Sequence, residues 1–372
     1  MSLDAFYIGF WIIYSWFTLL LWWGWRCLPE GYGSKRIDSS VYFSVLIVVR
    51  NEAKNISQLL EDLVKQSFSN FEVIVIDDNS TDGTLEILKK FSQDSPFSFK
   101  ILSYVRKKNF VAHKKACIAL GISHAKGSYI VTTDGDCRVL PTWLESIAEA
   151  ISATNAVFIS APVCFGSEQT IFEKMQTIEF ASLVGAGAAT LAFRRATMCS
   201  AANMCYQKKA FYEVNGYEGF EHIPSGDDEF LFHKIAKRYP EKIIYLKEKR
   251  AIVTTYPVKT IREFWKQRTR WGGKWTSYQN AVASFTAVFI FVFHFLNLLS
   301  LFLLLFNQLS FVVWAFGQSF KTIAEWLFVG SVLNFFSKRH LWILLPLVQI
   351  IHSFYIVVVG IGALFVKTNW KN

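Results

Sequence analysis

The sequence predicts an α/β domain with a mostly parallel sheet, joined to membrane-spanning helices. Strand-like and helix-like segments alternate from residue 41 to about 255, the order typical of an open sheet covered by helices. Long uncharged segments come before and after this region. The chain is 52% hydrophobic and only 18% charged, which is too apolar for one ordinary soluble domain. This composition also excludes an intrinsically disordered protein.

The first apolar segment, residues 7–25, contains no charged side chain. At a rise of about 1.5 Å per residue it is long enough to cross the hydrocarbon core once. It has neither the basic start nor the small-residue cleavage site of a signal peptide. Arg26, Lys35 and Arg36 follow it, so the positive-inside rule places the next domain in the cytosol. We therefore expect residues 1–36 to form a transmembrane helix with a basic flank.

The C-terminal part, residues 281–372, contains further candidate spans. Residues 281–306 and 341–366 are each long enough to cross a membrane with some tilt. Residues 309–336 are apolar but include Lys321 and Glu325, so this stretch either crosses or lies partly in the interface. We expect about three C-terminal spans, and hence a multi-pass integral membrane protein. Its expected location is the bacterial cytoplasmic membrane.

Residues 37–257 are expected to form the cytosolic α/β domain. Strands are predicted at 41–49, 71–76, 100–104 and 128–133, and helices at 53–66 and 113–124. The second strand is almost entirely apolar, as a parallel strand buried on both faces should be. Ligands of such sheets bind at the carboxyl ends of the strands, where the acidic residues of this chain fall. The pattern indicates a nucleotide-binding domain.

Charge and cysteine content narrow the possible partners. Lys and Arg exceed Asp and Glu by ten, which in a membrane protein favours contact with anionic headgroups or phosphorylated substrates. We expect no nucleic-acid partner. The six cysteines include no CxxC pair, so neither a zinc site nor a disulfide scaffold is indicated.

Phosphate must be held without the common glycine-rich loops. The sequence has no GxGxxG after the first strand and no GxxxxGK[ST], which disfavours a dinucleotide dehydrogenase or a P-loop enzyme. Asp134-Gly135-Asp136 follows the fourth strand, and two such carboxylates can share a hard divalent ion that bridges the oxygens of a diphosphate. Taken alone, this short motif is equally compatible with a plain strand-end turn.

Six motifs follow one another over about residues 41–275. They are Arg50-Asn51-Glu52, the run 77–84 (DDNSTDGT), His113-Lys114-Lys115-Ala116, Asp134-Gly135-Asp136, the run 226–231 (GDDEFL) and the run 267–271 (QRTRW). In this order they resemble the family 2 inverting glycosyltransferases, in particular the membrane-anchored branch that includes cellulose and hyaluronan synthases and ceramide glucosyltransferase. The order and spacing of the six motifs are more specific than any single motif.

The resemblance implies a GT-A fold that binds a nucleotide diphosphate sugar, usually UDP-linked, with Mg or Mn. It implies donor-binding roles for Asn51, Glu52, Asp78, Lys114, Asp134, Gln267 and Arg270. It places the metal on Asp136, the general base on Asp228 and acceptor contacts on Trp271, Asn203 and Asp227. The family usually has a glycine-containing turn near Asn203, but alanine replaces that glycine here, which weakens the transfer of that role.

The chemistry fits these residue types. Inverting transfer is an in-line displacement at the anomeric carbon, which needs a carboxylate to take the proton of the attacking hydroxyl and a cation to neutralise the leaving diphosphate. Asp227 beside Asp228 is a like-charge pair, which raises one apparent pKa toward neutrality. The alternative is that both carboxylates merely cap the helix expected at 228–238.

The segment 258–280 interleaves aromatic and basic side chains around the QRTRW motif, as an amphipathic interface helix does. A plain membrane anchor would explain this composition. The functional interpretation adds a bidentate phosphate contact from Arg270 and a sugar-stacking face on Trp271. We favour both roles together.

We therefore expect a metal-dependent inverting enzyme that moves a sugar to a lipid or other membrane-embedded acceptor. A processive polysaccharide synthase is the first alternative, because the QxxRW motif is shared with such enzymes. Few polar residues interrupt the apolar segments, which leaves little lining for a polymer channel and favours transfer of one or a few sugars. A non-enzymatic nucleotide-binding membrane scaffold is the alternative of another class.

Overall fold

The computed structural model describes residues 2–33, 37–106, 108, 110–274, 277–278 and 280–365. Lys35, Arg36 and Trp275, which the sequence places in basic or interfacial segments, lie outside this set. The chain forms two compact units. The α/β unit comprises residues 29–167 and 198–256, and the helical unit comprises residues 1–28, 168–197 and 257–368. The expected domain 37–257 is thus interrupted, because residues 168–197 pack with the helices.

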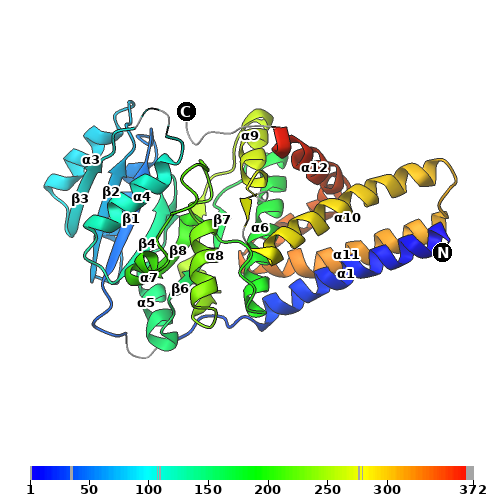
Figure 1. Cartoon of the computed structure of the whole chain (residues 1–372), viewed down its shortest axis with the longest axis horizontal. Helices are drawn as coiled ribbons and strands as arrows, with labels where there is room; N and C mark the ends of the chain where they lie inside the picture. The colour runs from blue at the N-terminus through cyan, green and yellow to red at the C-terminus, as the bar shows by residue number, and fades with distance from the viewer. Residues whose placement is uncertain are drawn as a thin grey trace. The chain divides into compact units, whose positions relative to one another are not determined.

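The α/β unit is built on a mixed sheet, which in the described residues has seven strands in the order β3-β2-β1-β4-β8-β6-β9 (Figure 1). The first four of these are parallel, whereas β8 runs antiparallel to both β4 and β6. The strands are β1 (Phe43–Val49), β2 (Phe71–Asp77), β3 (Ser98–Ser103), β4 (Tyr129–Asp134), β6 (Phe158–Ser160), β8 (Met204–Gln207) and β9 (Ile243–Tyr245). This architecture confirms the predicted mostly parallel α/β fold.

The register of β1 brings the acidic strand ends together. In the parallel pairing Val49 lies opposite Asp77 of β2, and Val48 lies opposite Asp134 of β4. All seven residues of β1 and of β2 are buried, because helices cover both faces of the sheet. The acidic residues at the ends of β2 and β4 therefore share one edge of the sheet, as the sequence predicts.

Helices cover the sheet through short apolar stripes. In α2 (Ile56–Val64), the side chains of Ile56, Leu59, Leu60 and Leu63 are almost fully buried, which is the stripe expected from their helical spacing. The other helices of this unit are α3 (Thr84–Gln93), α4 (His113–His124), α5 (Trp143–Thr154), α7 (Lys208–Glu213) and α8 (Glu229–Arg238). The 3-10 turns η1 (Ala201–Asn203) and η2 (Lys249–Ala251) complete it.

A small second sheet lies beyond the end of β4. Its order is β5-β10-β7, with β5 at Arg138–Val139, β7 at Val163–Phe165 and β10 at Val253–Thr255. β10 pairs antiparallel with β5 and parallel with β7. This sheet holds the chain directly after the Asp134-Gly135-Asp136 turn.

The helical unit contains the apolar segments. Its helices are α1 (Leu3–Cys27), α6 (Ile171–Ala192), α9 (Ile261–Gly272), α10 (Ala281–Leu305), α11 (Phe311–Phe335), the 3-10 turn η4 (Arg339–Leu344) and α12 (Leu345–Phe365). α1 and α11 lie side by side along much of their length (Figure 1). The small-residue run 185–189 is part of the continuous helix α6. Within this run, a Cβ on Gly185 would lie 2.5 Å from Val332 of α11. Glycine here permits close helix packing.

Three helical segments of the described chain are long and apolar enough to cross a membrane: Leu3–Cys27, Ala281–Leu305 and Arg339–Phe365. The expected third C-terminal span is a continuous helix, α11, but its composition does not qualify it as a spanning candidate. Two described C-terminal segments, rather than the expected three, therefore qualify as candidate spans.

The charges of α11 are buried and paired inside the helical unit. Lys321 Nζ lies 2.8 Å from a carboxylate oxygen of Glu325, and the Tyr14 hydroxyl of α1 donates to the other oxygen at 2.7 Å. Lys321 is only 2% exposed. Removing one partner of such a buried pair leaves an uncompensated charge, so these contacts tie α11 to α1.

We predict that Gly127→Ala destabilises the α/β unit. A Cβ at residue 127 would lie 2.5 Å from the backbone nitrogen of Ser44 and 2.8 Å from the carbonyl carbon of Phe43, and these backbone atoms cannot rotate away. Overpacking of this kind costs roughly 1–3 kcal/mol, so we expect the melting temperature of the purified protein to fall by several degrees.

Gly166→Ala is the matched control, because a Cβ there would meet Thr254 at an ordinary 3.5 Å. Equal melting temperatures for the two variants would show that the approach of residue 127 to β1 is not limiting.

Candidate functional site

The turn after β1 is fastened to the turn after β2. The Asn51 side chain accepts a hydrogen bond from the Thr81 N–H at 2.9 Å, and the Asn51 N–H donates to the Ser80 hydroxyl at 3.0 Å. Asn51 has a φ of 55°, a left-handed conformation that asparagine tolerates better than most residues. The Glu52 N–H donates to the Thr84 hydroxyl at 2.9 Å. Asn51 and Glu52 thus lie at the carboxyl edge where the sequence places them.

Asp78 is completely buried and held by Arg106. The guanidinium donates two hydrogen bonds to the two carboxylate oxygens, at 2.9 and 2.6 Å. This bidentate geometry is the strongest form of a carboxylate–arginine contact. Arg50 also donates to the Asp78 carbonyl, at 3.2 Å. Asp78 is thus held as one member of an ion pair, and its donor-binding role stays a prediction.

Lys114 joins two acidic residues that are far apart in the sequence. Its Nζ lies 2.8 Å from Asp134 Oδ1 and 3.2 Å from Asp227 Oδ2. Asp134 ends β4, Lys114 lies in the first turn of α4, and Asp227 lies directly before α8. The predicted donor-side and acceptor-side carboxylates are thus linked through one ammonium group.

The electrostatics of this cluster follow from its burial. Burial alone would lower the pKa of Lys114, but Asp134, Asp227 and Asp228 together raise that pKa above its ordinary value. The pKa of Asp227 is raised, first by burial and then by Asp228 and Asp134, while Lys114 opposes the increase. Lys114 therefore remains a cation and permits several carboxylates to share a small volume.

Asp228 is both a helix cap and a member of the cluster. Its carboxylate accepts hydrogen bonds from its neighbour, the Glu229 N–H, at 2.8 Å and from the Ala201 N–H at 3.3 Å. The capping alternative is thus realised in part, since Asp228 is the N-cap of α8. The two N–H groups also fix the orientation of the Asp228 carboxylate, which lies next to Asp227 in the sequence.

The Asp134-Gly135-Asp136 turn offers a candidate cation site. Ligand atoms of Asp134, Asp136 and Cys137 lie within 4.8 Å of one another. The two half-buried carboxylates suit Mg²⁺ or Mn²⁺, which prefer oxygen ligands. Cys137 does not suit them, because burial and the adjacent carboxylates raise its thiol pKa and keep the sulfur protonated. The fit to a hard divalent cation therefore depends on Asp134 and Asp136.

Asn203 lies in the interior with its amide fully used by the fold. Its Oδ1 accepts from the Trp143 indole N–H at 2.9 Å, and its Nδ2 donates to the carbonyls of Pro162 and Ala251, both at 2.8 Å. Asn203 is 0% exposed. This placement supports a structural role for the side chain and leaves no free amide atom for an acceptor.

Gln267, Arg270 and Trp271 lie in α9 of the helical unit, and their roles in the site remain predictions. The motif is anchored by its second residue, Arg268, which is 2% exposed. Arg268 forms a buried ion pair with Glu179 of α6, and its guanidinium lies 4.3 Å from the Trp271 ring centre. The Tyr355 hydroxyl of α12 donates to the same Glu179 carboxylate. These contacts fix the orientation of α9 within its own unit.

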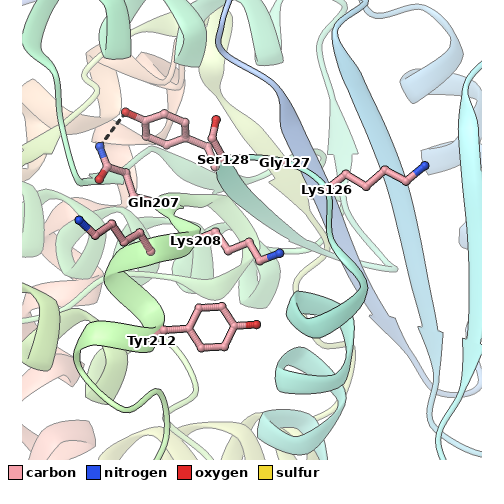
Figure 2. Close-up of a pocket in the computed structure, with 8 residues that line it drawn as sticks. Lys126, Gly127, Ser128, Gln207, Lys208 and Tyr212 are labelled. Atoms are coloured by element: carbon pink, nitrogen blue, oxygen red, sulfur yellow. Dashed lines mark hydrogen bonds between the residues drawn. The ribbon is translucent and has the colours of Figure 1, made fainter.

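A pocket of about 570 Å³ opens at the other end of β4 (Figure 2). It is lined by residues 126–129, 207–209 and 212, and Gln207 donates to the Tyr129 hydroxyl across one side. Two of its three lysines already have partners, since Lys208 donates to the Ala125 carbonyl and Lys209 pairs with Glu213. Tyr129 begins β4 whereas Asp134 ends it, so this pocket is separate from the acidic cluster.

Residues 44–214 match the family model described as Glycosyl transferase family 2. These residues are a family 2 glycosyltransferase domain. The family 2 match covers Asn51, Asp78, Lys114 and the Asp134-Gly135-Asp136 turn, and it ends before Asp227. The glycosyltransferase resemblance predicted from the sequence motifs is confirmed over this segment.

Two curated relatives show how far the sequence similarity extends. The chain is 34% identical over 113 residues to the cholesterol galactosyltransferase of Borreliella burgdorferi, covering 30% of each chain. A longer segment is 25% identical to a poly-beta-1,6-N-acetyl-D-glucosamine synthase of Staphylococcus epidermidis, covering 73% of this chain and 62% of that protein. The matched segments span less than two thirds of either relative.

A solved structure shows the same fold at low sequence identity. The mannosyltransferase PcManGT from Pyrobaculum calidifontis, in complex with GDP-Man and Mn2+, aligns with a TM-score of 0.57 and 13% identity. The alignment covers 97% of this chain and 99% of that one. It confirms the predicted GT-A fold around the family 2 domain.

Two residues of the site were missed by the sequence prediction. Arg106 follows β3 in a segment without a recognisable motif, and only the structure shows that it pairs with Asp78. Lys115 was quoted within a motif but was given no role, although its Nζ donates to the carbonyls of Phe220, Ile223 and Ser225. A lysine in the first turn of α4 next to Lys114 was the only available signal.

We predict that Asn203→Ala destabilises the protein by at least about 2 kcal/mol, because it leaves the Trp143 N–H and two buried carbonyls without their partner. Thermal unfolding of the purified protein measures the loss. Trp143→Phe removes the indole N–H and also shrinks a buried ring, so it should be destabilising alone. Its cost should be smaller in the Asn203→Ala background, where the hydrogen bond is already lost. Strict additivity of the two changes would contradict this assignment.

Proposed function

We propose that this protein is a metal-dependent inverting glycosyltransferase that transfers a sugar from a nucleotide diphosphate sugar to a membrane-embedded lipid or glycan acceptor. The observation that carries the proposal is the Lys114 bridge between Asp134 and Asp227. It supports a reaction centre in which Asp134, at the end of β4, and the Asp227-Asp228 pair both act at the bond between the sugar and the diphosphate. The family 2 domain supplies the reaction class.

The donor would bind along the carboxyl edge of the sheet. Asn51, Glu52 and the Asp78–Arg106 pair form the edge beside β1 and β2, where a base and ribose would lie. Lys114 and Asp134 continue this edge toward the sugar. We propose a UDP-linked donor. A diphosphate contact from Gln267 and Arg270 stays a prediction from the QRTRW motif.

The metal would be Mg²⁺ or Mn²⁺, held by Asp136 with help from Asp134. When bound, it neutralises negative charge on the departing diphosphate. Asp134 would then have two positively charged neighbours, the ion and Lys114. The presence of Mn2+ with the nucleotide sugar in the PcManGT structure is consistent with this assignment.

Asp228 would act as the general base. The acceptor hydroxyl oxygen attacks the anomeric carbon, the bond from that carbon to the diphosphate oxygen breaks, and the hydroxyl proton passes to the Asp228 carboxylate. The N–H groups of Glu229 and Ala201 hold this carboxylate in place. Asp227 would contact the acceptor beside it, and Trp271 would offer a stacking face for a sugar. Asn203 would support this region only from the interior.

The acceptor is proposed to be membrane-embedded because the chain carries three helical segments that could cross a bilayer. The basic residues after the first of them favour a catalytic domain on the cytosolic side. The similarity to a cholesterol galactosyltransferase is compatible with a lipid acceptor.

A processive polysaccharide synthase is the second candidate, favoured by the similarity to a poly-beta-1,6-N-acetyl-D-glucosamine synthase over 73% of this chain. Against it, several buried polar groups of the helical unit bond to one another: the Asn297 amide donates to Ser353 and accepts from Trp11. Such paired groups line a polymer path poorly. Product length after transfer by the purified protein separates the two candidates, since a synthase yields long chains.

We predict that Asp228→Asn lowers the turnover number for sugar transfer by about 10²- to 10⁴-fold, the usual contribution of a general base. Transfer is measured with labelled UDP- and GDP-linked sugars and a membrane lipid extract. The amide retains the shape of the side chain, so the affinity for UDP with Mn²⁺ should be unchanged. Asp94→Asn, at an exposed helix end, is the control. Wild-type turnover in the Asp228 variant would overturn the assignment of the base.

We also predict that nucleotide diphosphate and metal stabilise the protein together. At 100 times its dissociation constant a ligand adds roughly 2.7 kcal/mol, so UDP with Mn²⁺ should raise the melting temperature by several degrees. UDP with EDTA should have a much smaller effect. Asp136→Ala should abolish the difference between these two conditions. An undiminished response to Mn²⁺ in that variant would show that Asp136 is not the ligand.

A further inference from the structure

Lys115 is buried and holds a loop of the main chain. The residue is 3% exposed, and its Nζ donates to the carbonyls of Ile223 at 2.7 Å, Ser225 at 2.8 Å and Phe220 at 3.0 Å. An ammonium group has three N–H donors, so these three bonds use its full capacity. The positive charge therefore fixes three points of the segment 220–225.

The same ammonium group contacts the first turn of α8. It lies 5.1 Å from the centre of the Phe230 ring, within the range of a cation–π interaction. Phe230 stacks on Phe220 with ring centres 4.3 Å apart and an interplanar angle of 9°. Lys115 thus joins the start of the loop to the helix that follows it.

The loop ends at the two acidic residues of the site. Gly226, with a φ of 79°, turns the chain directly before Asp227 and Asp228, and the Phe230 N–H donates to the Gly226 carbonyl. Lys114 binds the Asp227 side chain from the same turn of α4. Two consecutive lysines therefore hold this segment. Lys115 binds its backbone carbonyls, and Lys114 binds the Asp227 carboxylate.

We propose that Lys115 is a positioning residue for the base Asp228. It holds residues 220–226 in the conformation from which the Asp228 carboxylate meets the acceptor hydroxyl, and it does not itself contact the donor. This inference rests on the proposed function, in which Asp228 takes the proton of the acceptor. A displacement of about 1 Å at a reacting group can cost 10²-fold in rate, so the loop position has a direct kinetic consequence.

The test compares Lys115→Met with Lys234→Met. Methionine keeps the length of the side chain and removes the ammonium group. Lys234 is the matched control because its Nζ also donates to main-chain carbonyls, those of Asn215, Gly216 and Glu218, in the preceding segment. The measurements are turnover in sugar transfer, the affinity for UDP with Mn²⁺, and amide hydrogen exchange of residues 220–226.

We expect Lys115→Met to lower turnover on the order of 10- to 100-fold, to leave UDP affinity unchanged and to speed exchange in residues 220–226, while Lys234→Met does none of these. In the Asp228→Asn background, Lys115→Met should add little further loss, because it acts through that base. If Lys115→Met does not fold, Lys115→Arg serves instead. It keeps the charge with a different geometry, and it should lower turnover without changing UDP affinity.

Three results would overturn the role of Lys115: an equal loss of UDP affinity and turnover, a full additional loss in the Asp228→Asn background, or the same effects from Lys234→Met. Unchanged turnover in the Lys115 variant together with an inactive Asp228→Asn variant would reject the positioning role alone. Wild-type turnover in Asp228→Asn would instead reject the proposed base.

Discussion

The interaction on which the site depends is the contact of one buried ammonium group, Lys114, with two carboxylates. Asp134, Asp227 and Asp228 come from the end of β4 and the start of α8, and their negative charges would repel one another in a poorly solvated space. Lys114 lies close enough to Asp134 and Asp227 to offset that repulsion. Lys114 reaches both carboxylates because α4 begins close to the end of β4. The topology of the sheet therefore brings the positive charge to the acidic residues.

Lysines in the first turn of α4 contribute in two chemically different ways. Lys114 meets carboxylates, whereas Lys115 meets backbone carbonyls and an aromatic ring. Both remove a positive charge from water, which is costly unless the charge is fully solvated by the protein. Three hydrogen bonds at Lys115 and two carboxylates at Lys114 meet that requirement. It also explains how a loop with little regular structure can hold acidic side chains in a defined position.

The helical unit shows the same constraint in an apolar setting. Lys321, Glu325 and Tyr14 satisfy one another, and Arg268 is satisfied by Glu179. Because an unpaired charge among apolar helices is strongly unfavourable, these contacts specify which helices pack together. Arg268 also connects the QRTRW motif to α6, since its guanidinium pairs with Glu179 and lies against the Trp271 ring.

The sequence by itself determined the first four strands of the main sheet, the helices that follow β1 and precede β4, and the carboxyl-edge position of Asn51, Asp78 and Asp134, because hydrophobic periodicity and strand-end acidic residues are local signals. The order of its motifs also predicted the family 2 glycosyltransferase domain that is confirmed over residues 44–214. Only the tertiary structure decided that Arg106 binds Asp78, that Lys115 holds residues 220–225, that Asn203 is a buried structural residue and that α6 belongs with the helical unit. Each of these depends on contacts between distant segments, and their geometry follows from packing and register rather than from local residue patterns.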